Sequence, residues 1–337
     1  MNFLQIGVGG FGGTWLKTIS KSQHRLAALV DVKPESLAKA SAEYNVPAER
    51  CFSDLAQALA AVQIDAAVVV TPPAFHRAPV EALLERGIPV ISEKPMAETM
   101  ADCRAMVAAH RRTGVEYTVS QNYRWAPAPM TARRLIGEGK LGTIGQMRFD
   151  FWLGAAFKGT FRETMDQPLI VDMAIHHCDL IRYVTGLDAV SASASSWNVP
   201  WSAFQKDSSA CCVYAMSNGA RVVYDGSWSA HGNHTNWSGD WLIEGTLGAL
   251  RHSHGKLWLN ETPPQVWAKA PFEWKEIAND TPPLLSQDYV LDDFARAIAE
   301  RRPTATTCTD NLNSVGMVFA ALESLAKDGA RVAIQPG

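Results

Sequence analysis

The stretch "VDMAIHHCDL" at residues 171–180 gathers side chains that can serve as acids, bases or metal ligands. On an α-helix, Asp172, His176 and Asp179 stand at positions i, i+4 and i+7 and share one face, whereas His177 points elsewhere. Three interpretations are open: a metal site, an acid–base site, or a buried helix with satisfied polar groups. A metal site would use Asp172 and His176 and would still need a third ligand. The spacing alone does not decide between these interpretations.

The composition of the chain narrows the classes of protein to which it can belong. Its 337 residues predict two domains, and a formal net charge of −3 without a basic run predicts neither nucleic acid nor a membrane surface as partner. No run of about 18 apolar residues is present, and the start "MNFLQIGVGG" is typical of a first strand rather than a signal peptide. Six cysteines without a CxxC pair indicate a reduced, cytoplasmic protein.

Residues 1–122 alternate between strand and helix patterns. Apolar runs such as "FLQIGV" and "AAVVVT" are typical of buried parallel strands, and helical spacing follows each of them. Asp54 is a plausible N-cap, and Gly87 and Gly114 close two of the helices. This order predicts an α/β fold in which the first domain is a Rossmann-type, doubly wound parallel sheet.

Residues 123–337 have a different pattern. Segments such as "IGQMRFDFWL" and "SACCVYAM" alternate with period two, and "SNGA" is a hairpin turn signal. We expect helices at 171–185, near 286–300 and near 310–327. The prediction is an α+β domain with a large, open, mostly antiparallel sheet. The C-terminal helices can pack back on the first domain. Ten of the eleven tryptophans lie here, and we expect them in the sheet core or a subunit interface, or one or two of them stacked on the apolar face of a sugar.

The first strand leads into a G-x-G-x-x-G motif that opens the first helix, and an acid ends the second strand. This context is typical of a dinucleotide site, with glycines for a tight turn and close backbone approach, and the pyrophosphate at the helix N-terminus. The acid accepts hydrogen bonds from ribose hydroxyls and repels a 2′-phosphate, which favours NAD over NADP, although Lys33 could partly offset that repulsion. The candidate cofactor-binding residues are Gly7, Gly9, Gly10, Phe11, Gly12 and Asp31.

Ligands of such sheets bind beyond the carboxyl ends of the strands. Three segments end there, "TPPAFH", "SEKP" and "SQNYR". A lysine at a strand end before a proline should face the crevice beside the nicotinamide. These segments add Thr71, Pro72, His76, Glu93, Lys94 and Gln121 to the candidate cofactor-binding residues.

The chain resembles the glucose–fructose oxidoreductase, inositol dehydrogenase and rhizopine-catabolism family (Gfo/Idh/MocA). The resemblance covers nearly the whole chain and rests on "GVGGFGG", "TPPAFH", "SEKP", "QNYRWAPA", "DMAIHHCDL" and "IEGTLGAL" in that order. It implies that Lys94 is the catalytic-site lysine and that the bond before Pro95 is often cis. It also implies that Asp172 and His176 lie over the nicotinamide, and that substrate contacts come from Asn122, Tyr123, Arg124, Asp172 and His176.

One position departs from the family pattern. The family usually has glycine between the aspartate and the histidine, where this chain has Ala174. Alanine is the better helix former and could narrow the approach of substrate. It removes no reacting group.

The reaction that the resemblance implies is hydride transfer between a secondary alcohol carbon and C4 of the nicotinamide. His176 would remove the hydroxyl proton, Asp172 would hold the substrate or support the imidazolium, and Lys94 would stabilise the developing alkoxide or relay the proton. The roles of Lys94 and His176 can be exchanged. The lysine and the cationic nicotinamide predicted nearby disfavour a dication, so for Asp172 and His176 we favour acid–base chemistry and expect no bound metal.

Sugars, cyclitols and their derivatives are the implied substrates. The loop 227–241 offers His231, Asn233, His234 and Asn236 to substrate hydroxyls or to solvent. Two alternatives stay open: a redox-neutral enzyme that retains NAD and cleaves or epimerises a glycoside, and a catalytically silent NAD-binding regulator, which should lack the lysine or the histidine. By the same resemblance we expect a homodimer or homotetramer.

Overall fold

The chain divides into two compact units. The computed structural model describes residues 1–262 and 272–335. The first unit comprises Met1–Asn122 and Leu284–Leu312, and the second comprises Tyr123–Pro283 and Asn313–Gly337.

The first unit contains a six-stranded sheet of order β3-β2-β1-β4-β5-β6 in which every described pair is parallel. Strands β2 and β3 follow on one side of β1, and β4, β5 and β6 follow on the other side. Ligands of doubly wound sheets bind at this switch point between β1 and β4. The predicted fold of this region is confirmed. The strands are β1 (Asn2–Ile6), β2 (Arg25–Val30), β3 (Cys51–Phe52), β4 (Ala66–Val69), β5 (Val90–Ser92) and β6 (Tyr117–Val119).

Local sequence signals set the ends of the helices in this unit. The Asp54 side chain accepts a hydrogen bond from the Gln57 backbone N–H, as predicted for an N-cap, and Gly114 ends α5 with a φ of 69°. The α-helices are α1 (Gly12–Lys21), α2 (Pro34–Tyr44), α3 (Leu55–Ala61), α4 (Arg77–Leu84), α5 (Met100–Thr113), α9 (Ser286–Glu300) and the start of α10 (Cys308–Leu325). The 3-10 turns are η1 (Ala48–Arg50), η2 (Pro73–Phe75) and η3 (Asn122–Trp125).

The segment Leu284–Leu312 packs on the edge of the first sheet although it comes late in the sequence. Val119 donates its N–H to the Thr306 carbonyl, and the Thr118 and Thr304 hydroxyls are 2.8 Å apart. At the other end of the segment, the Thr18 hydroxyl donates to Asp288 at 2.9 Å. The bonds of Val119 and Thr118 continue the sheet edge beyond β6, and the bond of Thr18 joins the segment to helix α1.

The second unit contains a nine-stranded sheet of order β14-β13-β12-β11-β7-β10-β9-β8-β15. Its described pairs are antiparallel except β10–β7, so the predicted, mostly antiparallel sheet is confirmed. The strands are β7 (Ile144–Trp152), β8 (Ala189–Trp197), β9 (Ser209–Met216), β10 (Arg221–Ser227), β11 (Asp240–Gly245), β12 (Ala249–Ser253), β13 (Lys256–Asn260), β14 (Lys275–Ile277) and β15 (Val332–Ala333).

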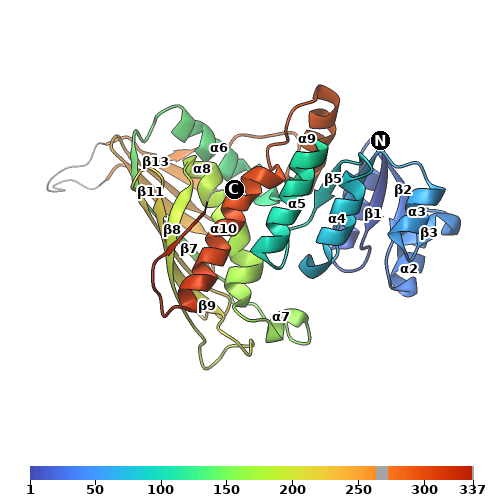
Figure 1. The fold of residues 1–337 in the computed structure, drawn as a ribbon. Helices are drawn as coiled ribbons and strands as arrows, with labels where there is room; N and C mark the ends of the chain where they lie inside the picture. Colours follow the sequence, from blue (N-terminus) through green and yellow to red (C-terminus); the bar gives the residue numbers. More distant parts are fainter. Residues whose placement is uncertain (263–271, 336–337) are drawn as a thin grey trace. The chain divides into compact units, whose positions relative to one another are not determined.

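The two faces of this sheet differ, and β7 shows how. Phe149 and Phe151 are buried and contact His177 of α8, so this face carries the helix. Arg148 and Asp150 alternate with them and belong to the opposite face. Figure 1 shows α8 beside the strands of this unit. The helices are α6 (Pro127–Gly137), α7 (Phe161–Thr164), the π-helical turn η4 (Leu169–Met173), α8 (Ala174–Thr185) and the rest of α10.

Among residues 1–262 and 272–335, no helix combines the length and the apolar character needed to span a bilayer. Of the ten tryptophans that the sequence has in the second domain, Trp267 lies outside the described residues.

Candidate active site

The glycine-rich loop between β1 and α1 has a conformation that side chains would prevent. A Cβ at Gly7, where φ is +86°, would lie 2.7 Å from the Val70 carbonyl oxygen, and a Cβ at Gly12 would lie 2.5 Å from the Gly7 carbonyl oxygen. The buried Gln5 amide donates to the carbonyls of both Gly7 and Gly12, at 3.0 and 2.8 Å. The Gln5 side chain therefore holds the glycine loop in this conformation.

The outer side of this loop is open, as a dinucleotide needs. A Cβ at Gly10 would meet nothing within 4 Å, and Phe11 is 53% exposed. Asp31 follows β2, and its carboxylate accepts the backbone N–H groups of Val8 and Lys33, both at 2.9 Å. These bonds hold the acid against the glycine loop, where the fingerprint places the ribose. The residues present fit a dinucleotide.

The His76 side chain connects two of the three loops at the carboxyl edge of the sheet, those after β4 and β5. Its ring is buried, with Nε2 2.6 Å from the Thr71 carbonyl oxygen and Nδ1 3.0 Å from the Met96 carbonyl oxygen. Burial lowers the pKa of His76, against the opposing effect of the carbonyls, which favours the neutral ring. His76 therefore positions the loops after β4 and β5.

The end of β5 has the backbone expected from the family resemblance. The Lys94–Pro95 bond is cis, which confirms that expectation. The buried Glu93 carboxylate accepts hydrogen bonds from the Trp15 indole at 2.7 Å and from the Lys94 backbone N–H at 3.1 Å. Burial raises the pKa of Glu93, while Trp15 and Lys94 act in the opposite direction. Glu93 thus anchors the turn that carries Lys94 to helix α1.

Gln121 is a buried amide whose environment fits a bound cofactor. Its side chain is 1% exposed, and neither its oxygen nor its nitrogen has a hydrogen-bond partner among the described residues. A buried amide without partners is rare in native proteins and needs an explanation. Because Gln121 follows β6 at the carboxyl edge of the sheet, a bound cofactor is a natural partner for it.

The helix predicted to carry Asp172, His176 and Asp179 differs from the expectation in its first turn. Asp172 lies in the π-helical turn η4, and α8 begins only at Ala174, whose N–H bonds to the Leu169 carbonyl. The helix predicted at 171–185 is confirmed from Ala174 to Thr185, but the turn that carries Asp172 is π-helical and not α-helical. Such turns are frequent at functional sites.

Tyr123 and His176 form a stacked pair in the second unit. Their ring centroids are 4.1 Å apart and their planes are inclined by 7°. His176 is 6% exposed. Burial raises the pKa of Tyr123, and the charge of Asp172 adds to that effect, so the acid lies within electrostatic reach of the stack. The structure thus groups the candidates Tyr123, Asp172 and His176.

The other candidates for substrate contact have protein partners. Arg124 donates from Nε and from a terminal nitrogen to the Asp179 carboxylate, at 2.5 and 2.6 Å, and both side chains are buried. Ser314 adds a hydrogen bond to the same carboxylate at 2.8 Å. Asn122, in the first unit, donates to the Ser286 hydroxyl at 2.9 Å. Asp179 therefore serves a buried ion pair.

His177 ties α8 to the loop after β10. Its Nε2 lies 3.0 Å from the Trp237 carbonyl oxygen, and its Nδ1 lies 3.1 Å from the Tyr224 hydroxyl. Because a carbonyl only accepts, Nε2 carries the hydrogen, and in the neutral ring Nδ1 accepts from Tyr224. The side chain next to His176 thus has a positioning role.

Sequence reasoning missed Arg162. This side chain, on α7, forms an ion pair with Asp172 through Nε at 2.5 Å. It precedes Asp172 by ten residues in a segment without apolar periodicity, so no signal in the sequence joined the two.

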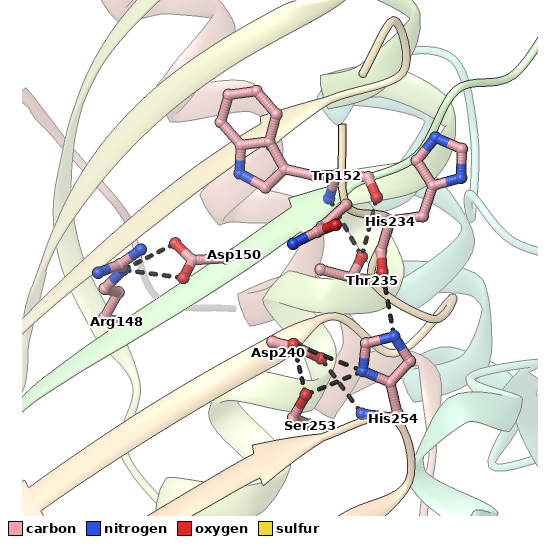
Figure 2. Close-up of a pocket in the computed structure, with 9 residues that line it drawn as sticks. Arg148, Asp150, Trp152, His234, Thr235, Asp240, Ser253 and His254 are labelled. Carbon is pink, nitrogen blue, oxygen red and sulfur yellow. Dashed lines mark hydrogen bonds and ion pairs between the residues drawn. The ribbon is translucent and has the colours of Figure 1, made fainter. Parts of the chain in front are cut away.

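A cavity of about 550 Å³ lies on the face of the second sheet opposite to α8. Figure 2 shows Arg148 and Asp150 of β7 on one side and Asp240 of β11 with His254 on the other. Two loop residues proposed for hydroxyl contacts, Asn233 and His234, line this cavity. Since His176 is on the helix of the other face, this cavity is separate from the Tyr123–His176 stack.

The remaining loop candidates have local partners. The His231 ring lies 5.8 Å from Trp201, and the Asn236 oxygen accepts the Ser238 N–H at 3.0 Å. Within residues 1–262 and 272–335, no group of three or more His, Cys, Asp or Glu side chains is arranged to hold a metal ion.

Comparison with known families gives two matches along the chain. Residues 1–121 match the oxidoreductase family with an NAD-binding Rossmann fold, and residues 130–251 match the GFO/IDH/MocA C-terminal domain. The first match covers the region of alternating strands and helices, and the second lies in the region of the antiparallel sheet.

Individual relatives agree with the family match. The uncharacterized protein y4oX of Sinorhizobium fredii is 30% identical over 96% of this chain and 92% of its own length. The D-apiose dehydrogenase of Paraburkholderia graminis is 30% identical over 74% of this chain and 69% of its own length. An Agrobacterium radiobacter oxidoreductase, solved with NAD⁺, L-tartaric acid and magnesium, aligns with a TM-score of 0.88 at 22% identity over 99% of this chain and 98% of its own, a likeness that shows the fold.

Proposed function

Since the chain belongs to the Gfo/Idh/MocA family of NAD-binding oxidoreductases, we propose that it is a dehydrogenase of a secondary alcohol in a sugar, cyclitol or related polyol. The observation that carries the proposal is the set Lys94, Asp172 and His176. Lys94 stands at the carboxyl end of β5 before a cis proline, and His176 is stacked on Tyr123 near the Asp172 charge. The similarity to a D-apiose dehydrogenase supports a sugar-like substrate.

The proposed roles follow from the chemistry of each group. Bound NAD supplies the hydride acceptor. His176 removes the proton of the substrate hydroxyl, and its stacking on Tyr123 fixes the plane of the imidazole. Asp172 holds the substrate or supports the imidazolium, and Lys94 stabilises charge on the reacting oxygen. An exchange of the roles of Lys94 and His176 fits the same residues.

We also propose that NAD is preferred over NADP. The support is Asp31, whose carboxylate is held at the glycine loop by two backbone N–H groups. A fixed negative charge there repels a 2′-phosphate and accepts ribose hydroxyls. Lys33 offers its backbone N–H to that carboxylate.

Assembly into a homodimer or homotetramer, in the cytoplasm, is part of the same proposal. On the open face of the second sheet, Val213 and Val223 are directly paired and 40% and 39% exposed. Exposed β-branched side chains in the middle of a sheet favour coverage by another surface. All six cysteines are free, which fits a reducing compartment. Light scattering measures the molar mass of the purified protein in solution. A monomer at micromolar concentration contradicts the proposed assembly.

The deciding experiment is an absorbance assay for reduced nicotinamide. Purified protein is mixed with NAD or NADP and a panel of inositols, aldoses and sugar acids. The variants are His176→Ala and Lys94→Met, with His254→Ala as the control because His254 is exposed and lies on the face of the second sheet opposite to α8. Turnover of one polyol that is lost in the first two variants and kept in the control supports a dehydrogenase.

Other results point to other functions. Cofactor that stays bound through purification, with no net reduction but with cleavage or epimerisation of a glycoside, supports the redox-neutral enzyme. Cofactor binding without any turnover supports the silent regulator. Full turnover in His176→Ala contradicts the proposed base.

A further inference from the structure

The carboxylate of Asp172 is held by an arginine that the proposed chemistry does not use. Arg162 Nε lies 2.5 Å from Asp172 Oδ2. The two side chains are 29% and 12% exposed, so the pair is partly shielded from water. A hydrogen bond between two charged groups at this distance is among the stronger ones in proteins and constrains both partners.

Arg162 is itself fixed by aromatic rings. Its guanidinium lies over Phe157 at 5.2 Å and over Phe161 at 4.6 Å from the ring centroids. Such cation–π contacts favour a planar guanidinium over an ammonium. Phe157 in turn packs edge-on against Phe204 and Trp228, with centroids 6.1 and 5.2 Å away. Because Trp228 is fully buried, this arrangement anchors the guanidinium to the body of the second unit.

The backbone around Arg162 is also tied down. The Glu163 side chain accepts the Gly159 N–H at 2.6 Å, and the Glu163 carbonyl accepts the Gln205 N–H at 2.9 Å. The short helix α7 therefore has connections on both sides. Arg162 is a rigid support rather than a surface side chain that happens to reach an acid.

The other neighbour of Asp172 is the stacked pair of Tyr123 and His176. Asp172 acts on the Tyr123 hydroxyl electrostatically, and Tyr123 covers the imidazole at 4.1 Å. Asp172 lies in a π-helical turn, a conformation that is frequent at functional sites. The ion pair with Arg162 constrains its carboxylate.

We propose that Arg162 is a positioning residue that holds the Asp172 carboxylate, through Oδ2, in the orientation that the proposed reaction uses. The inference rests on the proposed function, because it assigns the support of a proposed reacting group. A misplacement of a catalytic group by about 1 Å costs on the order of 100-fold in rate. Loss of Arg162 should therefore lower kcat by about 10- to 100-fold while cofactor affinity stays unchanged.

The test compares Arg162→Met, Arg162→Lys and Arg162→Ala with Arg148→Met. Arg148 is the matched control because it pairs with Asp150 at 2.8 Å, on the opposite face of the sheet from α8. We expect kcat to fall in all three Arg162 variants, least in Arg162→Lys, with each variant folded and its NADH affinity, measured by fluorescence, close to that of the parent. Millimolar guanidinium should restore part of the kcat of Arg162→Ala, and tetramethylammonium should not.

Several outcomes overturn the inference. An unchanged kcat in Arg162→Met does so. A rise in the KM for the polyol without a fall in kcat also does so, since Arg162 would then contact substrate. If Arg162→Met fails to fold, Arg162→Lys decides: a folded variant with full kcat overturns the inference.

The failure of the proposed function has a different signature. In that case the parent protein turns over none of the polyols. The contact itself is then tested by urea unfolding of Arg162→Met, Asp172→Asn and the double variant. Strictly additive shifts of the unfolding midpoint overturn the inference, and non-additive shifts support it.

Discussion

Arg124 and Asp179, 55 residues apart in sequence, form a two-pronged ion pair inside the second unit, with distances of 2.5 and 2.6 Å. Arg182 also reaches this site: it shares the Ser314 hydroxyl with Asp179 and pairs with Asp188 at 2.6 Å. Removal of one partner from a buried pair leaves an uncompensated charge. This relationship gives Arg124 a structural duty beside any contact with substrate.

Asp179→Asn should therefore lower the free energy of unfolding by about 3–5 kcal/mol. The matched control is Asp280→Asn, which breaks the exposed pair of Arg134 with Asp280 and should cost about 1 kcal/mol or less. Urea unfolding monitored by tryptophan fluorescence measures both. Equal losses in the two variants would show that burial does not determine the strength of the Arg124–Asp179 pair.

Asp31 should set the choice of cofactor. The Val8 and Lys33 N–H groups bond to different oxygens of Asp31, so Asp31→Asn keeps an acceptor for one of them and removes the negative charge. We expect the ratio of kcat/KM for NADP to that for NAD to rise about tenfold or more, which corresponds to about 1.4 kcal/mol. Lys33→Met is the companion variant, and it should lower any residual use of NADP. A ratio that stays constant in Asp31→Asn contradicts the role of the charge.

His177 should stabilise the loop after β10. In His177→Phe the Trp237 carbonyl and the Tyr224 hydroxyl lose their partner, which should cost about 1–3 kcal/mol. Phenylalanine keeps the packing on Phe149 and Phe151, so the loss reports on the hydrogen bonds. Unfolding in urea gives the total, and hydrogen exchange of residues 229–239 locates it. His231→Phe should change stability by less than about 0.5 kcal/mol, and an effect as large as that of His177→Phe speaks against the anchoring role.

Patterns local in sequence predicted much of the first unit. The alternation of apolar runs with helical spacing gave the parallel sheet, and Asp54 and Gly114 marked helix ends, because capping depends on neighbouring residues. The glycine loop was recognisable because the close approaches at Gly7 and Gly12 exclude any side chain. Such signals lie within a few residues of the structure that they determine.

Features that depend on tertiary contacts were not predictable in this way. No sequence signal marked the π turn at Asp172. The two ion pairs, Arg124 with Asp179 and Arg162 with Asp172, join residues whose separation in sequence matches neither a helix nor a strand period. The short strands β14 and β15 carry too few residues for an alternation to stand out. Long-range packing determines these features, and a single sequence contains no local trace of it.

His252 should make the second unit sensitive to acid. This histidine is 1% exposed, stacks on Trp241 at 4.5 Å, and has a buried Nδ1 without a hydrogen-bond partner among the described residues. Burial lowers the pKa of His252 to about 4; Asp240 and the Gly239 backbone act against that shift, and His254 adds to it. Below its usual pKa of 6.5 the unfolded chain takes up a proton that the folded chain does not. Stability present above pH 6.5 is therefore lost as the pH falls towards 4.

The full loss attributable to His252 amounts to about 3 kcal/mol, and His252→Phe should abolish it. The phenyl ring keeps the stack on Trp241 and cannot take up a proton. The measurement is the free energy of unfolding in urea between pH 7 and pH 4, for the parent, His252→Phe and His254→Gln. Burial also lowers the pKa of His24 and His76 in the first unit, so the parent curve contains their share and only the difference between variants isolates His252. His254→Gln is the exposed control, and parallel curves for the parent and His252→Phe would mean that the buried ring does not control the acid response.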